Sequence, residues 1–291
     1  MRAVRLDSDG LPELADISEP DGPGELVHVR GCGLCGSDVE KLGAAAPGTV
    51  LGHEIDGVLE NGERVAVLHR VACGSCSRCR AGHESTCDEF RLLRVTPGGF
   101  SERLRSTHHV PLPDSLDEWA GIWVEPLACI LRAAPLVPRG RNLTVGCGSV
   151  GLLWIQVLLA RGDDVFASDP RPERLAAAAQ LGAQKTAGPV GGAVLTAPSG
   201  LGDALSRLDP GGTLLIFAAT TNPVPVALDA VYRRELHLVG SRSATRESYD
   251  AAIELLPSLS LPELTTLPLE RFVEGLELYR RGDALKVVFT P

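Results

Sequence analysis

A glycine-rich turn between two apolar segments limits the folds open to this chain more than any other feature. The stretch NLTVGCGSVG begins with a β-branched segment and continues into the spacing Gly146-x-Gly148-x-x-Gly151. The apolar run LLWIQVLLARG follows it and is typical of a helix that ends near Gly162. Such glycines allow a tight turn and let a pyrophosphate come close to the N-terminus of the helix. The pattern therefore predicts a dinucleotide-binding unit.

An acidic residue stands where such a unit binds the adenosine ribose. The next predicted strand, DDVFASD, ends at Asp169, close to the expected interval of about 20 residues after the last glycine. A carboxylate there can accept hydrogen bonds from the ribose hydroxyls of NAD, whereas it repels the 2′-phosphate of NADP. Arg171 and Arg174 could pair with that phosphate. The sequence therefore favours NAD over NADP. The alternative to a dinucleotide site is a glycine-rich turn in another kind of α/β protein.

Strands and helices continue to alternate after this unit. We expect a helix at PERLAAAAQLGA, strands near Lys185–Ala187 and Ala193–Thr196, a helix near Leu201–Leu208, a strand at GTLLIFAA, a helix near Val226–Glu235 and a strand at LHLVGS. Such alternation builds a doubly wound parallel sheet. Only GPVGG lies between the third and fourth strands, which is too short for a crossover helix. We therefore expect that edge of the sheet to be reduced.

Four cysteines lie close together in the stretch VACGSCSRCRAGHESTC. Their spacing, C-x2-C-x2-C-x7-C, lets the sulfur atoms converge on one point, as four thiolates do in a closed structural zinc site. Unrelated buried cysteines, a redox CxxC pair or a zinc-ribbon interaction module are the alternatives. The motif uses only a small part of the chain, so we interpret it as a structural element of something larger. The four residues are Cys73, Cys76, Cys79 and Cys87.

A second set of possible metal ligands is spread over GCGLCGSDVE, VLGHEIDG and WVEPLAC. Three protein ligands from separate segments, with a replaceable fourth position, are typical of a catalytic zinc site. We expect Asp38 to accept a hydrogen bond from the imidazole of His53. Cys32 and Cys35 also form a CxxC pair, so a second structural zinc site is an alternative. The candidate ligands are Cys35, His53, Glu54 and Glu125.

Charge and hydropathy exclude several other classes of protein. The net charge of −9 argues against a nucleic-acid partner or an anionic membrane surface. No apolar run reaches the length of about 20 residues that a membrane span needs, and the first residues lack the apolar core of a signal peptide. We expect a cytoplasmic protein, in which the eight cysteines serve metal binding or packing rather than disulfides.

The motifs GCGLCGSD, LGHEIDG, CGSCSRCRAGHESTC, GGFSE, VEPLAC, GCGSVG and GDALKVVF, in this order, resemble the zinc-dependent medium-chain alcohol dehydrogenases. The acid in VEPLAC is similar to that of the polyol (sorbitol-like), glucose and threonine dehydrogenase branch. The resemblance covers essentially the whole chain. It implies an α/β architecture with a GroES-like β-barrel catalytic domain and a Rossmann doubly wound parallel sheet. We expect the catalytic domain at 1–126, the Rossmann domain at 127–245, and a segment at 246–291 that returns to the catalytic domain.

The resemblance also implies an activity. The enzyme would oxidise a secondary alcohol, polyol or sugar with NAD, or reduce the carbonyl, and would carry two zinc ions in a homodimer or homotetramer. Zinc would act as a Lewis acid, and Ser37 would take the proton towards the nicotinamide ribose. The implied catalytic residues are Cys35, Ser37, His53, Glu54 and Glu125. The implied cofactor-binding residues are Gly146, Gly148, Ser149, Val150, Gly151, Asp169 and Arg174.

Four features depart from the family pattern. The loop KLGAAAPGTV is compressed, GVLENGERV forms a tight hairpin, and the third crossover of the Rossmann domain is missing. Glu40 stands where the family often has a histidine, so the last step of the proton relay is open. A zinc-independent quinone or enone reductase on the same fold and a catalytically inactive dinucleotide-binding protein are the alternative functions.

Overall fold

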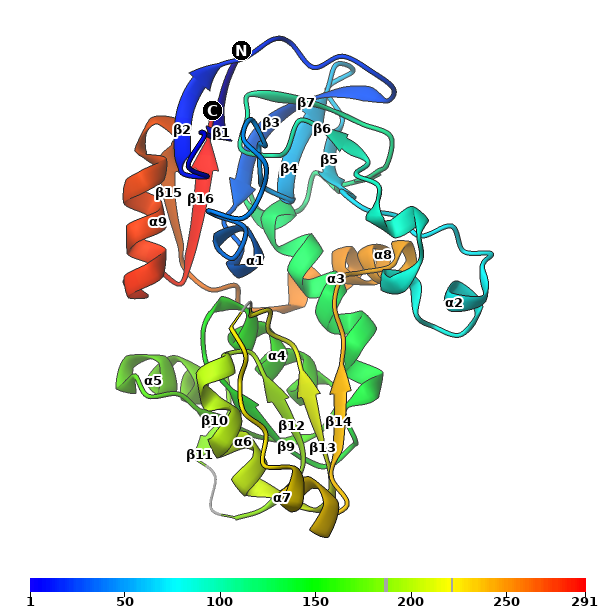
Figure 1. Ribbon diagram of the computed structural model, residues 1–291, viewed down its shortest axis with the longest axis vertical. Helices are drawn as coiled ribbons and strands as arrows, with labels where there is room; N and C mark the ends of the chain where they lie inside the picture. The colour runs from blue at the N-terminus through cyan, green and yellow to red at the C-terminus, as the bar shows by residue number, and fades with distance from the viewer. Residues whose placement is uncertain (186–187, 221) are drawn as a thin grey trace. The chain divides into compact units, whose positions relative to one another are not determined.

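The computed structural model describes residues 1–185, 188–220 and 222–291, which form two compact units (Figure 1). The first unit contains Met1–Ala128, Ala244–Ser258 and Glu263–Pro291. The second unit contains Cys129–Ser243 together with the short segment Leu259–Pro262. The chain passes from the first unit to the second after Ala128 and returns to the first after Ser243. No helix in the described ranges is both long and apolar enough to cross a membrane.

The first unit is built around an eight-stranded, mainly antiparallel sheet to which both ends of the chain contribute. Strand β16 reaches it from the C-terminus and pairs with β3, where Val288 lies opposite Gly33. Strand β3 in turn pairs with β4 and β7. The strands are β3 (Glu25–Gly33), β4 (Glu54–Leu59), β5 (Arg64–Val67), β6 (Val95–Thr96), β7 (Arg103–Ser106), β8 (His109–Pro111), β15 (Leu264–Pro268) and β16 (Lys286–Thr290), and a separate pair is formed by β1 (Arg2–Leu6) and β2 (Pro12–Asp16).

The core of this unit contains three aromatic rings from separate parts of the chain. Phe100, Phe272 and Phe289 have ring centroids 4.4 to 5.6 Å apart and are buried with the alternating apolar residues of β3 and β4. Aromatic side chains bury large apolar areas, so this cluster joins the C-terminal segment to the N-terminal strands. The helices of the unit are α1 (Gly36–Val39), α2 (Ser77–Arg80), α8 (Arg246–Leu255), α9 (Phe272–Arg281) and the first half of α3 (Val124–Ala133).

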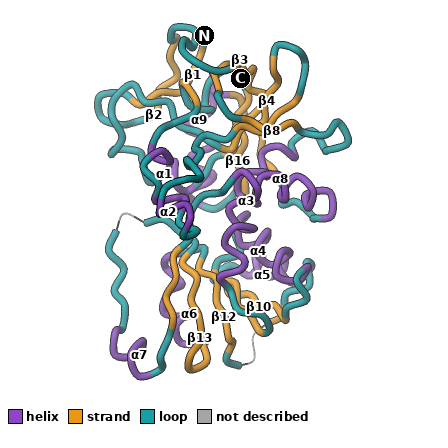
Figure 2. Tube along the Cα trace, turned by 90° about the vertical axis from the view of Figure 1, so that its right-hand side faces the viewer, coloured by secondary structure: helices purple, strands orange, loops and turns teal. Residues whose placement is uncertain are grey.

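The second unit is a parallel sheet with the strand order β11-β10-β9-β12-β13-β14 (Figure 1). Three of its strands, β10, β12 and β13, are labelled in the turned view of Figure 2. The order reverses direction beside β9, which is the switch point at which doubly wound sheets bind their ligands. The strands are β9 (Arg141–Val145), β10 (Asp164–Ser168), β11 (Gln184–Lys185), β12 (Val190–Leu195), β13 (Leu208–Ile216) and β14 (His237–Gly240), and the helices are α4 (Ser149–Ala160), α5 (Pro172–Gln180), α6 (Leu201–Arg207) and α7 (Leu228–Arg233).

The reduced edge of this sheet agrees with the sequence. Strand β11 is only two residues long, and β12 begins at Val190, so no crossover helix fits between them. The expected strand near Lys185–Ala187 is described only at its first residue, because Thr186 and Ala187 lie outside the described ranges. The expected strand at Ala193–Thr196 is longer than predicted and starts before its two glycines. The doubly wound α/β fold is confirmed.

Candidate active site

The first part of the candidate site is the turn that follows β3. Cys35 is the N-cap of the short helix α1, and its backbone N–H donates to Asp38 Oδ2 at 3.2 Å. This bond fixes the turn locally, as a capping side chain does. The turn holds the Ser37 hydroxyl 3.6 Å from Cys35 Sγ. A thiol and a hydroxyl are therefore presented together at the end of β3.

The second part lies at the start of the neighbouring strand. His53 directly precedes β4 and Glu54 is its first residue, paired in register with Gly33 at the end of β3. Because β3 and β4 are antiparallel, the end of one strand and the beginning of the other meet at the same edge. Cys35 Sγ, a ring nitrogen of His53 and a carboxylate oxygen of Glu54 consequently lie within 4.8 Å of one another. This mixed sulfur, nitrogen and oxygen set matches the ligands that zinc takes in proteins.

Asp38 orients the imidazole of this group. Its Oδ1 lies 3.1 Å from His53 Nδ1, and the backbone N–H of Gly52 also donates to it at 3.4 Å. Burial alone raises the pKa of Asp38, but the facing His53 ring outweighs it and lowers the pKa. Burial lowers the pKa of His53, yet Asp38 and Cys35 together raise it well above the usual range. With Nδ1 engaged, His53 presents Nε2 to a metal, which is the usual arrangement for a histidine ligand.

Lys286 is a member of the site that the sequence interpretation missed. It lies in β16, is 2 % exposed, and forms an ion pair with the carboxylate of Glu54, which is 1 % exposed. Its ammonium also donates to the carbonyl of Leu34 at 3.4 Å and lies 5.6 Å from the centre of the Trp123 ring. Burial lowers the pKa of Lys286, but the charges of Glu54 and Cys35 outweigh burial and raise the pKa above its ordinary value. The sequence signal that could have revealed Lys286 is a single lysine at the start of the apolar segment KVVF.

The remaining predicted residues lie at different distances from this group. Ser37 Oγ is 3.5 Å from His53 Nε2, so its hydroxyl reaches the metal-facing side of the ring. Glu125 is buried in the first turn of α3 but is not part of the group whose ligand atoms lie within 4.8 Å of one another. It still acts on the pKa of Lys286 through its charge. Glu40 ends α1 as its C-cap residue.

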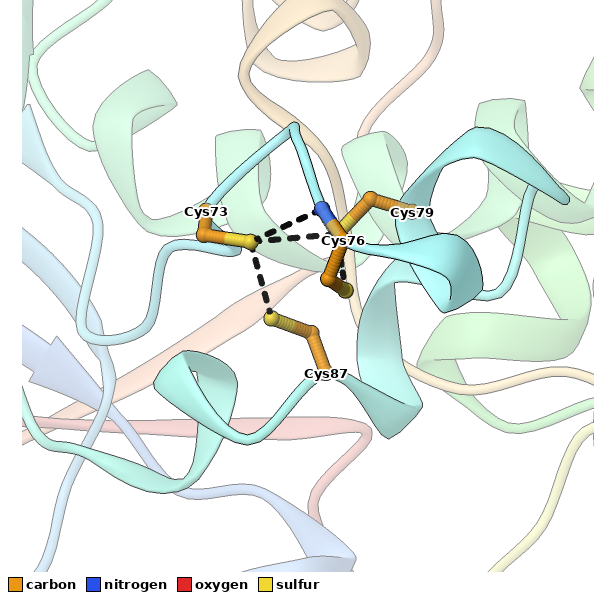
Figure 3. Close-up of side chains that lie close together, drawn as sticks. All are labelled: Cys73, Cys76, Cys79 and Cys87. Atoms are coloured by element: carbon orange, nitrogen blue, oxygen red, sulfur yellow. Dashed lines mark hydrogen bonds between the residues drawn. The ribbon is translucent and has the colours of Figure 1, made fainter.

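The four-cysteine motif forms a compact cluster around α2 (Figure 3). Neighbouring sulfur atoms are 3.5 to 3.9 Å apart, and all four lie within 4.8 Å of one another. Hydrogen bonds from the backbone and side chain of Ser75 lower the pKa of Cys73 to about 6. Thiolates are the form that binds metals, so these bonds prepare the sulfur for zinc. The four cysteines that the spacing singled out, Cys73, Cys76, Cys79 and Cys87, therefore converge as candidate zinc ligands.

The glycine-rich turn has the geometry that a dinucleotide site needs. Gly146 has a φ of +95° directly after β9, and Gly148 is the N-cap of α4, whose first residues are Ser149 and Val150. A Cβ on Gly151 would collide with the carbonyl oxygen of Gly146, so the backbone can approach this closely only at glycine. The backbone N–H groups at the start of α4 are thus accessible to a pyrophosphate.

Asp169 lies directly after β10 and is held by the backbone of two loops. Its carboxylate accepts N–H bonds from Cys147 at 2.7 Å and from Arg171 at 2.9 Å. The side chain is 3 % exposed, and Arg174 Nη1 lies 4.0 Å from it. A carboxylate has about four lone-pair positions, so further hydrogen bonds from ribose hydroxyls remain possible. Burial and the nearby Asp169 raise the pKa of the Cys147 thiol to about 12, which makes this cysteine unreactive.

Comparisons with known proteins support the same interpretation. Residues 22–114 match the family model described as "Alcohol dehydrogenase GroES-like domain". An L-galactonate-5-dehydrogenase of Escherichia coli is 28% identical over 273 residues, with 80% of each chain covered. A D-altritol 5-dehydrogenase of Agrobacterium fabrum is 30% identical over 288 residues and covers 84% of this chain and 85% of the relative. The structure of acetophenone reductase from Geotrichum candidum in complex with NAD shares the fold, with a TM-score of 0.89, 22% identity and coverage of 100% and 97%.

Proposed function

Because this chain belongs to the zinc-dependent medium-chain alcohol dehydrogenase family, we propose that Cys35, His53 and Glu54 form its catalytic zinc site. The protein is an oxidoreductase that acts on the CH–OH group of small-molecule alcohols. One observation carries the assignment of the site: sulfur, nitrogen and oxygen ligands from two segments lie within 4.8 Å of one another at one edge of the sheet. The named relatives are dehydrogenases. Their names therefore do not favour the two alternative functions, an inactive dinucleotide-binding protein and a quinone or enone reductase.

We propose a separate role for each residue around this group. A zinc ion held there supplies Lewis-acid polarisation of the substrate hydroxyl. Asp38 keeps the His53 ring in the orientation that presents Nε2. The Ser37 hydroxyl, 3.5 Å from that nitrogen, accepts the proton from the reacting alcohol and passes it on. Glu40 stands where the family often has a histidine, so we assign the next step of the proton relay to no residue.

Two carboxylates are candidates for the remaining ligand position. Glu54 belongs to the group of ligand atoms but also forms an ion pair with Lys286. Glu125 is buried nearby in α3 and influences the same lysine through its charge. We propose that each of these carboxylates would exchange with water or substrate at the zinc, and that Lys286 would serve as the second partner of Glu54. A buried carboxylate needs such a partner when it leaves a metal.

We propose that the second unit binds NAD in preference to NADP. Gly146, Gly148 and Gly151 supply the turn, and Ser149 and Val150 offer backbone N–H groups to the pyrophosphate. Asp169 would accept hydrogen bonds from the ribose hydroxyls of the cofactor, and Arg174 would lie against its adenine. The bound cofactor supplies the hydride acceptor.

The substrate class that we propose is a secondary alcohol, a polyol or a sugar. The acid Glu125 in VEPLAC and the names of the relatives, an L-galactonate-5-dehydrogenase and a D-altritol 5-dehydrogenase, support this choice. We further propose that the protein acts in the cytoplasm as a homodimer or homotetramer. The domain boundaries at 126/127 and 245/246 are part of the same proposal.

Metal analysis of two variants tests the site assignment. We expect about two zinc ions per chain in the wild type, one in the closed four-cysteine group and one in the open group of Cys35, His53 and Glu54. Cys35→Ser should lose one zinc and essentially all turnover, with little change in melting temperature. Cys76→Ser should lose the other zinc and melt at a much lower temperature, because a structural zinc contributes folding free energy directly. Normal turnover in Cys35→Ser would exclude Cys35 as a ligand of the catalytic zinc.

A further inference from the structure

A histidine outside the predicted set lies against the candidate zinc site. His69 follows β5, two strands from β3 in the same sheet, and its ring centroid is 4.8 Å from that of His53. The backbone fixes this position, because the carbonyl of His69 accepts a hydrogen bond from the N–H of Arg94 at 2.9 Å. The backbone of His69 is thereby fixed, and its ring lies beside His53, a proposed ligand of the zinc.

The ring nitrogens of His69 have no hydrogen-bond partner among the described residues. Nδ1 is enclosed and unpartnered, and no side-chain or backbone group engages Nε2. Leaving a buried polar atom without a partner costs about 1–3 kcal/mol. By contrast, the corresponding nitrogen of His53 is engaged by Asp38. A histidine placed in this way at a catalytic group needs an explanation other than packing.

His69 is not one of the candidate metal ligands. It is not part of the group formed by Cys35, His53 and Glu54, whose ligand atoms all lie within 4.8 Å of one another. A neutral imidazole has one donor and one acceptor nitrogen. A buried nitrogen that has no partner is tolerated better as an acceptor than as an N–H donor. Because Nδ1 is the enclosed nitrogen of His69, the proton is placed on Nε2. The ring then has one N–H to offer to a neighbouring ligand.

We propose that His69 Nε2 donates a hydrogen bond to a second hydroxyl of the substrate, on the carbon next to the one that is oxidised. This inference rests on the proposed function, because it assumes that the reacting hydroxyl lies at the Cys35, His53 and Glu54 group. The oxygen atoms of hydroxyls on adjacent carbons are separated by about one hydrogen-bond length. The reacting hydroxyl would then lie beside His53 and the second hydroxyl beside His69, whose rings pack side by side. The site should therefore prefer vicinal diols and polyols over simple secondary alcohols.

The test compares 2,3-butanediol with 2-butanol in the wild type and in two variants. His69→Phe keeps a ring against His53 but removes the donor, whereas His69→Gln keeps an N–H donor. We expect His69→Phe to lose about three- to tenfold in kcat/KM with the diol, mainly through KM, and to change less than twofold with 2-butanol. His69→Gln should recover part of the loss. The diol should also slow the removal of zinc by a chelator in the wild type, and less so in His69→Phe.

The outcomes separate this inference from the function on which it rests. If the wild type oxidises neither alcohol, the proposed function fails, and the inference fails with it. If the wild type oxidises both alcohols and His69→Phe keeps the same preference for the diol, His69 does not bind the second hydroxyl. Equal losses with both alcohols in both variants, together with loss of zinc, would show a structural role and would also overturn the inference.

Discussion

Asp38 is the residue on which the geometry of the candidate zinc group depends most. It is 1 % exposed and connects the turn of Cys35, the backbone of Gly52 and the ring of His53. The sequence predicted its bond to His53, because Asp38 and Cys35 share one short turn. The ion pair of Glu54 with Lys286 could not be predicted, since these residues are far apart in the chain and meet only through the pairing of β16 with β3. The place of His69 beside His53 was hidden for the same reason.

The choice between NAD and NADP depends on a single carboxylate. Asp169 is held by two backbone N–H groups and is almost fully enclosed, so its carboxylate is fixed in one orientation. Its charge should repel a 2′-phosphate in a partly desolvated site. We expect the wild type to show a higher kcat/KM with NAD than with NADP. Asp169→Ser should narrow this preference, because Arg171 and Arg174 remain to pair with the phosphate.

Steady-state kinetics with both cofactors measure this effect, and Asp164→Ser offers a matched control. Asp164 is an exposed aspartate at the other end of the same strand. The control should keep the preference of the wild type. A wild type that already favours NADP would contradict the assignment of Asp169.

Strand β1 illustrates how one ion pair joins an element to the rest of its unit. The Arg2 guanidinium donates to Glu102 Oε1 at 2.7 Å, and the Arg2 backbone N–H donates to the other carboxylate oxygen at 2.9 Å. The side-chain hydrogen bond from Arg2 contributes most to lowering the pKa of Glu102 below its ordinary value of 4.5. The stabilisation is therefore fully present above the ordinary pKa, and it is lost as the pH falls through the lowered value.

Glu102→Gln should lower the free energy of unfolding at neutral pH by about 0.2–1 kcal/mol, because the pair is partly exposed. The difference from the wild type should vanish in acid, where both side chains are uncharged. Urea unfolding at neutral pH and at a pH well below the lowered pKa would measure both values. An equal loss at the two pH values would show that the charge of Glu102 is not responsible.

The elements of the second unit follow from local patterns, and those of the first unit do so only in part. Strand, turn and helix of the βαβ unit are adjacent in the chain, and GPVGG shows by its length that no crossover helix is present. In the first unit, β3 pairs with β4, β7 and β16, and only β4 is its close neighbour in the sequence. Such register cannot be predicted from periodicity alone. There the family resemblance, not the pattern of residues, supplied the fold.

At the scale of the whole molecule, the two groups of candidate metal ligands found among the described residues lie in one unit, and the glycine-rich turn lies in the other. The sequence revealed the kinds of sites, because cysteine spacing and glycine spacing are local. It also suggested that both ends of the chain contribute to the catalytic unit. The brief passage of Leu259–Pro262 through the second unit was not foreseen. Gln156 explains that passage, since its side chain bonds the backbone N–H and carbonyl of Ser260 at 2.7 and 3.0 Å.

The most direct test of the central claim is the formation of NADH from a panel of secondary alcohols and polyols, measured on one preparation in three states. The protein is assayed as purified, after removal of accessible zinc by a chelator, and after zinc is restored. We expect turnover in the first state, its loss in the second and its recovery in the third, with Cys35→Ser inactive throughout. Turnover that survives chelation and the Cys35→Ser substitution would contradict a zinc-dependent dehydrogenase with this catalytic site.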